Sequence, residues 1–113
     1  MYEPFNFCVT DEQSGVNPID TARLAELIAD LKRREPAPFV TPSPHSGENY
    51  VWRVARLRKT AEAMIEAGAD MVIGHGAHRV QEIDRIKGRW VFYSIGNFVF
   101  NSDGEFELNR STP

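Results

Sequence analysis

Blocks of apolar residues in the first half of the chain predict a strand, a helix and a second strand. Residues 5–10 are aromatic and β-branched and end at a polar stretch, which favours a strand followed by a loop. Asn17 and Pro18 are typical of residues that begin a helix, and apolar positions at helical spacing follow them. We therefore expect a helix over about 18–34, ended by a proline. The apolar run 37–41 is bounded by prolines and predicts a short buried strand.

The second half predicts another amphipathic helix, a short strand and a β-hairpin. The residues on the apolar face of this helix are Tyr50, Val54, Leu57, Ala61, Met64 and Ile65. Gly68 is placed to end the helix, and the apolar residues 71–73 then predict a strand. Residues 80–85 alternate in polarity, Lys87-Gly88 provides a turn, and residues 90–95 return.

Strands that alternate with helices predict an α/β fold with short parallel strands, two helices and a C-terminal β-hairpin. Parallel strands end at the same edge of a sheet, where ligands usually bind. Because crossovers are nearly always right-handed, both helices should cover one face. The apolar strands indicate burial on both faces, so the second face would need a cover from outside these 113 residues.

Length and composition narrow the class of protein. The chain has 113 residues, enough for one domain spanning 1–113, and its 42% apolar content is typical of a packed core. A net charge of −3 gives no basic surface for nucleic acid. The single cysteine, Cys8, lies in an apolar run and is interpreted as a small buried side chain. No run of apolar residues is long enough to span a membrane and no secretory signal is recognisable, so we expect a soluble chain.

All three histidines of the chain, His45, His75 and His78, follow the second and third predicted parallel strands. They should therefore converge at one edge of the sheet, where Gly74 and Gly76 permit close backbone approach. Three neutral imidazoles with one position left for water suit a divalent cation, which lowers the pKa of bound water toward ~7. One interpretation is a hydrolytic metal site holding Zn, Mn or Fe, and the other is ordinary polar loop residues.

Polar residues near the histidines could assist such a site. Glu48 could orient an imidazole or act as a general base, or could be an ordinary acidic residue ahead of a helix. Asn97 returns to the same edge after the hairpin and could hydrogen-bond to a ligand, although Gly-Asn after a strand is also a common turn. Asp11 and Glu12 follow the first predicted strand and could also reach this edge.

Two other groups of residues have both an ordinary and a functional interpretation. The basic residues near the start of the second helix could hold a phosphate or form a solvated face; they are Arg53, Arg56, Arg58 and Lys59. Trp52 and Trp90 favour core or edge packing over a stacking platform.

Three sequence blocks carry a resemblance to a known family. Residues 45–50 are His-Ser-Gly-Glu-Asn-Tyr, and residues 67–78 are Ala-Gly-Ala-Asp-Met-Val-Ile-Gly-His-Gly-Ala-His. Residues 92–100 are Phe-Tyr-Ser-Ile-Gly-Asn-Phe-Val-Phe. In order and spacing the blocks resemble the CapA-like family of bacterial capsule and poly-γ-glutamate synthesis proteins, a branch of the calcineurin-like metallophosphoesterase superfamily. The chain departs from the family pattern at Ser46, Asn49, Gly76 and Ala77, which the resemblance matches to Trp, an acidic residue, His and Pro.

The resemblance implies a partial layered metallophosphoesterase-like αβ fold. It also implies that His45, His75 and His78 are metal ligands in one half of a dinuclear site. The implied activity is metal-assisted hydrolysis of a phosphoester, or a role in assembling or exporting an anionic surface polymer. The family's Asp-x-His, Gly-Asp and Gly-Asn-His motifs have no counterpart here, so the chain is expected to be the C-terminal half of the domain.

A missing N-terminal half or a second copy of the chain would then complete the site. Two alternatives stay open: a non-catalytic metal-binding or docking module in polymer synthesis, and a mononuclear hydrolase with Glu48 as its base. Members of the family are often tethered to the membrane by an N-terminal segment that this chain lacks, so the sequence leaves localisation open.

Overall fold

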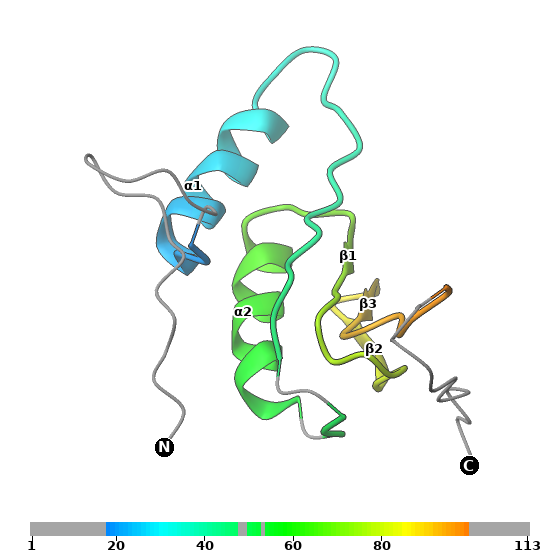
Figure 1. Cartoon of the computed structure of the whole chain (residues 1–113). Helices are drawn as coiled ribbons and strands as arrows, with labels where there is room; N and C mark the ends of the chain where they lie inside the picture. The colour runs from blue at the N-terminus through cyan, green and yellow to red at the C-terminus, as the bar shows by residue number, and fades with distance from the viewer. Residues whose placement is uncertain (1–17, 48–49, 53, 100–113) are drawn as a thin grey trace.

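The computed structural model describes residues 18–47, 50–52 and 54–99 (Figure 1). Its elements are α1 (Thr21–Lys32), α2 (Ala55–Glu66), β1 (Met71–Ile73), β2 (Ile83–Ile86) and β3 (Arg89–Phe92). Figure 1 shows α1 packed on α2, and α2 between α1 and the strands. The α/β class is thus confirmed as two helices and a mixed three-stranded sheet in this part of the chain. The strand predicted over 5–10 and the residues Cys8, Asp11 and Glu12 lie outside the described residues.

Helix α1 is shorter than the predicted range of 18–34. Asp20 caps its first turn, because its Oδ1 accepts a hydrogen bond from the backbone N–H of Arg23 at 3.0 Å. Pro18, predicted as the first helical residue, therefore precedes the cap. The predicted cap, Asn17, lies outside the described residues.

Helix α2 buries the apolar face that the spacing predicts. Its side chains Ala61, Met64 and Ile65 are buried in the core. Gly68 follows the helix with a φ of 110°, which confirms its role as the terminator. Tyr50, expected on the same helix, lies before it instead and is half exposed.

The strand predicted over 37–41 is not formed, and the chain there runs in an extended form beside β1 (Figure 1). The carbonyl oxygens of Pro42 and Pro44 accept hydrogen bonds from the backbone N–H groups of Ile73 and His75. The bond from His75 to Pro44 measures 2.9 Å. In a parallel ladder these residues would also donate, but proline has no N–H. The ladder is therefore incomplete at 42–44, and within 37–41 the backbone N–H of Val40 donates to the side chain of Asp70 rather than to a strand. His45 pairs with His75 as an isolated parallel bridge.

The three strands form a sheet in the order β1-β3-β2, with β1 parallel and β2 antiparallel to β3. The predicted hairpin is confirmed, since Lys87 and Gly88 connect β2 to β3 with φ angles of 49° and 79°. Two successive positive φ angles are typical of the primed turns that suit the twist of a hairpin. A purely parallel sheet is therefore not what these residues form.

Both helices lie on the same side of the strands, but α2 packs on β1 and α1 packs on α2, so the prediction that both helices cover the sheet face holds for α2 (Figure 1). The register places Val72, Val91 and Asp84 in one row, and the two valines are buried in the core beside α2. The opposite face is only partly covered: Ile83 is 55% and Trp90 48% exposed. Burial on both faces is therefore not observed within the described residues.

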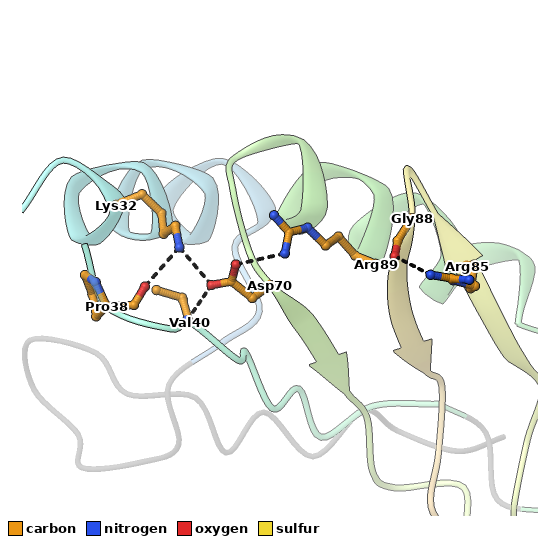
Figure 2. A network of polar contacts seen from close by, with 7 residues as sticks. All are labelled: Lys32, Pro38, Val40, Asp70, Arg85, Gly88 and Arg89. Carbon is orange, nitrogen blue, oxygen red and sulfur yellow. Dashed lines mark hydrogen bonds and ion pairs between the residues drawn. The ribbon is translucent and has the colours of Figure 1, made fainter. Parts of the chain in front are cut away.

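Asp70 ties the helical layer to the sheet (Figure 2). Its Oδ2 accepts hydrogen bonds from Lys32 Nζ and from the backbone N–H of Val40, both at 2.8 Å. Its Oδ1 pairs with Arg89 Nη1 at 3.1 Å. The hydrogen bond from Lys32, and after it the one from Val40, favours the charged carboxylate. These bonds lower the pKa of Asp70 below its ordinary value.

No helix among the described residues is long and apolar enough to cross a lipid bilayer.

Candidate functional site

The bridge between His45 and His75 fixes two of the three histidines at one edge of the sheet. The backbone N–H of His75 donates to Pro44 at 2.9 Å, and the N–H of Ser46 donates to the carbonyl of His75 at 2.7 Å. Residues directly opposite one another on neighbouring strands project their side chains to the same face. The structure thus places these two loops next to each other, as the sheet-edge argument predicts.

Glycines allow the three chain segments of this edge to approach one another closely. A Cβ atom added at Gly74 would lie 2.1 Å from the carbonyl oxygen of Tyr93, closer than any side chain permits. At Gly76 the φ angle is 114°, and a Cβ atom would lie 2.7 Å from the carbonyl oxygen of Ser46. The two glycines flanking His75 are therefore required by backbone contacts on both of its sides.

His78 is held by Asn97, which returns to this edge after β3. The Nδ1 of His78 lies 3.1 Å from Asn97 Oδ1. In the tautomer that carries its proton on Nδ1, the His78 ring donates a hydrogen bond to the amide oxygen of Asn97. The amide of Asn97 thus has the position of a residue that orients an imidazole.

Tyr50 supports the same histidine from the loop before α2. Its ring stacks on the His78 ring with 5.8 Å between the centroids, and its backbone N–H donates to the carbonyl of Ala77 at 2.8 Å. Tyr50 and His78 have φ angles of 62° and 58°. Backbone in this left-handed region is costly for residues other than glycine, so these surrounding contacts maintain both conformations.

The described residues do not complete a set of ligands by themselves. Among them, no three His, Cys, Asp or Glu side chains are grouped so that they could hold a metal ion. His45 and His75 stand opposite each other, and His78 is turned to Asn97. Glu48, the predicted general base, lies outside the described residues.

The sequence did not single out Arg79 and Gln81, which also fix this edge. The guanidinium of Arg79 lies 4.3 Å from the centroid of the Trp52 ring, and its Nη1 donates to the carbonyl of Tyr50 at 3.2 Å. Gln81 is 2% exposed, and its Nε2 donates to the carbonyl of Val51 at 2.7 Å. Only the position of Arg79 directly after the last histidine could have drawn attention to it.

The basic start of α2 is partly engaged in ion pairs. Arg58 Nη2 lies 2.9 Å from Asp84 Oδ2, and its Nε lies 3.4 Å from Glu62 Oε1. These contacts explain Arg58 as a residue that joins α2 to the sheet, which leaves its charge compensated. Arg53 lies outside the described residues.

Comparison with known proteins relates this sequence to bacterial capsule synthesis proteins. A family described as "Bacterial capsule synthesis protein PGA_cap" matches residues 1–102. The chain is 35% identical over 96 residues to the PGA biosynthesis protein CapA of Bacillus subtilis (strain 168), covering 84% of this chain and 25% of the relative. It is 37% identical over 95 residues to the capsule biosynthesis protein CapA of Bacillus anthracis, covering 81% of this chain and 23% of the relative.

A more distant match has a related name. A probable polyglutamine synthesis accessory protein of Mycobacterium tuberculosis (strain ATCC 25618 / H37Rv) is 31% identical over 81 residues, 71% of this chain and 20% of the relative. The chain thus spans about a quarter or less of the length of these relatives. Since the family match extends over most of the chain and includes all three histidines, the chain belongs to the CapA-like family of bacterial capsule synthesis proteins.

Proposed function

We propose that this chain is the C-terminal part of a CapA-like, metal-dependent phosphoesterase-type protein of capsule or poly-γ-glutamate synthesis. The observation that carries the proposal is the pairing of His45 with His75 at the strand edge, with Asn97 oriented on His78 nearby. In this proposal the three histidines form half of a dinuclear metal site. We also propose that the complete domain has a layered metallophosphoesterase-like αβ fold, of which this chain forms a part.

The described residues fit a divalent metal ion in chemistry but are not grouped closely enough to hold one by themselves. Imidazole suits zinc, manganese and iron, and Asn97 has the position of a residue that orients the His78 ring. The described residues gather no group of three ligands, so the proposal needs further ligands from outside them. A bound metal would supply a Lewis acid and a water of lowered pKa for attack on a phosphoester.

Those further ligands would come from a longer protein or from a second copy of the chain. The relatives are about four times as long as the matched segment, which makes room for a second half of the site. The substrate we propose is a phosphoester or an anionic polymer, and the names of the relatives, which refer to PGA and capsule biosynthesis, support the polymer. Glu48 is the residue we propose as a base or as an orienting group.

Metal content tests the proposal directly. The 113-residue protein, purified without chelator, should retain a divalent metal that elemental analysis detects, and the double variant His75→Ala, His78→Ala should lose it. A control variant, Glu66→Gln with Glu82→Gln, changes two exposed carboxylates and should keep the wild-type stoichiometry. An unchanged metal content in the double histidine variant would contradict every metal-site interpretation.

Activity on bis-p-nitrophenyl phosphate then separates the half-site from a self-sufficient enzyme. A half-site predicts no turnover by the chain alone, even with metal bound. Turnover that disappears in the double histidine variant and in Glu48→Gln would instead support a mononuclear hydrolase.

The exposed sheet face favours a second candidate, a non-catalytic docking module in polymer synthesis. Ile83 and Trp90 are about half exposed on the face away from α2. Two measurements test this alternative. Size-exclusion chromatography with light scattering gives the oligomeric state, and binding of an apolar dye reports exposed apolar surface. A monomer that binds no dye, and whose behaviour is unchanged by Ile83→Lys, would argue against a docking role.

A further inference from the structure

We propose that Arg79 binds an oxyanion, a carboxylate or a phosphate group of the substrate, at the histidine edge. The inference rests on the proposed function, since that function puts the substrate at this edge. It adds a recognition residue that is not a metal ligand.

Contacts on two sides fix the position of the Arg79 guanidinium. Its central carbon lies 4.3 Å from the centroid of the Trp52 ring, a distance at which the ring face attracts a cation. Its Nη1 donates to the carbonyl of Tyr50 at 3.2 Å. Ring and carbonyl both belong to the loop before α2, so the side chain bridges the two loops of the edge.

Arg79 is also coupled to His78. The two residues are adjacent in sequence, and the ring of Tyr50, whose carbonyl accepts the Arg79 hydrogen bond, stacks on the ring of His78. An anion held by Arg79 would therefore lie near the histidine that Asn97 orients. This is the geometry expected of a residue that positions an anionic substrate beside the proposed metal ligands.

The charge of Arg79 is not neutralised by a carboxylate of the described residues. Arg33, Arg58 and Arg89 each form an ion pair with an aspartate, whereas Arg79 forms none within that part of the chain. A guanidinium has five N–H donors in a planar fork, and the Tyr50 carbonyl engages one of its nitrogens. The remaining donors match the two oxygens of a carboxylate or phosphate.

Preorganisation strengthens this inference. A long flexible arginine loses rotamer freedom when it binds a ligand, and this loss weakens binding. The contacts with Trp52 and Tyr50 impose this loss before the ligand arrives. A partly exposed cation held in this way is suited to recognition as well as to surface packing.

Arg85 offers a matched control within the same chain. Its guanidinium lies 4.8 Å from the centroid of the Trp90 ring, and its Nη2 donates to the carbonyl of Gly88 at 3.1 Å. Figure 2 shows Arg85 and Gly88 at the hairpin, beside the turn that connects β2 to β3. Arg85 thus repeats the chemistry of Arg79 in a place without histidines.

The test is a titration of the whole 113-residue protein followed by NMR of its two tryptophan indole N–H signals. Inorganic phosphate serves as the probe for a phosphoester, and an acetylated triglutamate amide serves as the probe for polymer carboxylates. We expect at least one probe to shift the Trp52 signal in a saturable way and to leave the Trp90 signal in place. The probe that does so identifies the source of the oxyanion.

Arg79→Gln should weaken that binding by about tenfold or more, as expected when a charge-assisted hydrogen bond is lost. Arg79→Lys should retain part of it, because the charge remains and the fork is lost. Arg85→Gln should bind like the wild type. The proposal is overturned if neither probe moves the Trp52 signal, if Arg79→Gln binds like the wild type, or if both glutamine variants weaken binding equally.

Metal content measured on the same variants separates this inference from the proposed function. Arg79→Gln should keep the wild-type metal content, because Arg79 is not proposed as a ligand. Oxyanion binding that depends on Arg79 in a protein without a metal site would support the inference and contradict the proposed function. A metal site together with oxyanion binding that does not depend on Arg79 would support the proposed function and contradict the inference.

Discussion

Asp70 is a single residue that joins segments far apart in the sequence. Its carboxylate is 8% exposed and contacts Lys32 from α1, Val40 from the extended segment and Arg89 from β3 (Figure 2). A buried carboxylate left without its partners is strongly destabilising, whereas an exposed ion pair contributes little. The contribution of this network to the free energy of unfolding therefore depends on the burial of Asp70 more than on the number of its partners.

Asp70→Asn should lower the free energy of unfolding by about 2 kcal/mol, because a buried amide oxygen accepts weaker hydrogen bonds from Lys32 and Val40 than the charged carboxylate does. We place the loss below the range for fully buried pairs since Lys32 and Arg89 are partly exposed. Urea unfolding measures the change. The matched control is Asp30→Asn, which breaks the exposed pair with Arg33 and should cost no more than about 0.5 kcal/mol. Equal losses in the two variants would contradict the argument.

The pH dependence of this difference has a definite sign. The pKa of Asp70 is lowered in the folded protein by the hydrogen bonds from Lys32 and Val40, so below about pH 4 the unfolded chain binds a proton that the folded one does not. The stabilisation is complete above the ordinary carboxyl pKa and is lost as the pH falls through the folded value. The gap between wild type and Asp70→Asn should therefore narrow in acid.

At the scale of elements, two prolines decide that the extended segment is not a full strand. Pro42 and Pro44 accept hydrogen bonds from the chain beside them but cannot return them. In the alternating pattern of a parallel ladder, an N–H at position 44 would face the carbonyl of Ile73. The incomplete ladder is therefore a consequence of sequence, because backbone direction and spacing already suit a strand.

Pro44→Ala should supply the missing donor. We expect the new backbone amide at this position to exchange slowly with deuterium, and the segment to pair with β1 beyond the present bridge. Stability should change by no more than about 1 kcal/mol, since the new hydrogen bond offsets the greater freedom of the unfolded chain. The control is Ser43→Ala, one residue earlier in an exposed position. It keeps Pro44 and should leave the exchange rates of the backbone amides in this segment and in β1 unchanged. Fast exchange of the new amide would show that the segment is held apart by something other than proline.

The same elements show what the sequence can and cannot predict. The hairpin follows from local chemistry, because Lys87-Gly88 sets the turn and hence the register. The predicted start of α1 is wrong by a few residues since Asp20 competes with Asn17 as a cap, and local spacing does not decide between them. The juxtaposition of His45 and His75 is predictable from topology alone. The stacking of Arg79 on Trp52 is not, because it depends on side-chain contacts between separate loops.

At the scale of the whole molecule, the fold depends on the contact between α2 and one face of the sheet. The polar part of this contact centres on Asp84, whose Oδ2 accepts a hydrogen bond at 3.4 Å from the hydroxyl of Tyr93, a residue that is 3% exposed. Arg58 of α2 pairs with the same carboxylate at 2.9 Å. Arg58 thus joins α2 to the sheet through Asp84, the same carboxylate that the phenol of the buried Tyr93 contacts.

Burial, and secondarily the charge of Asp84, raises the pKa of Tyr93 to about 12. The unfolded chain would release this proton near pH 10, so the stabilisation is complete below about pH 10 and is lost as the pH rises toward the folded value. Two pH units correspond to on the order of 2–3 kcal/mol. Urea unfolding between about pH 8 and 12 should show wild type losing about that much more stability than Tyr93→Phe. Tyr50→Phe, which changes a half-exposed ring, should follow the wild type. Parallel curves of stability against pH for wild type and Tyr93→Phe would contradict the raised pKa of Tyr93 in the folded protein.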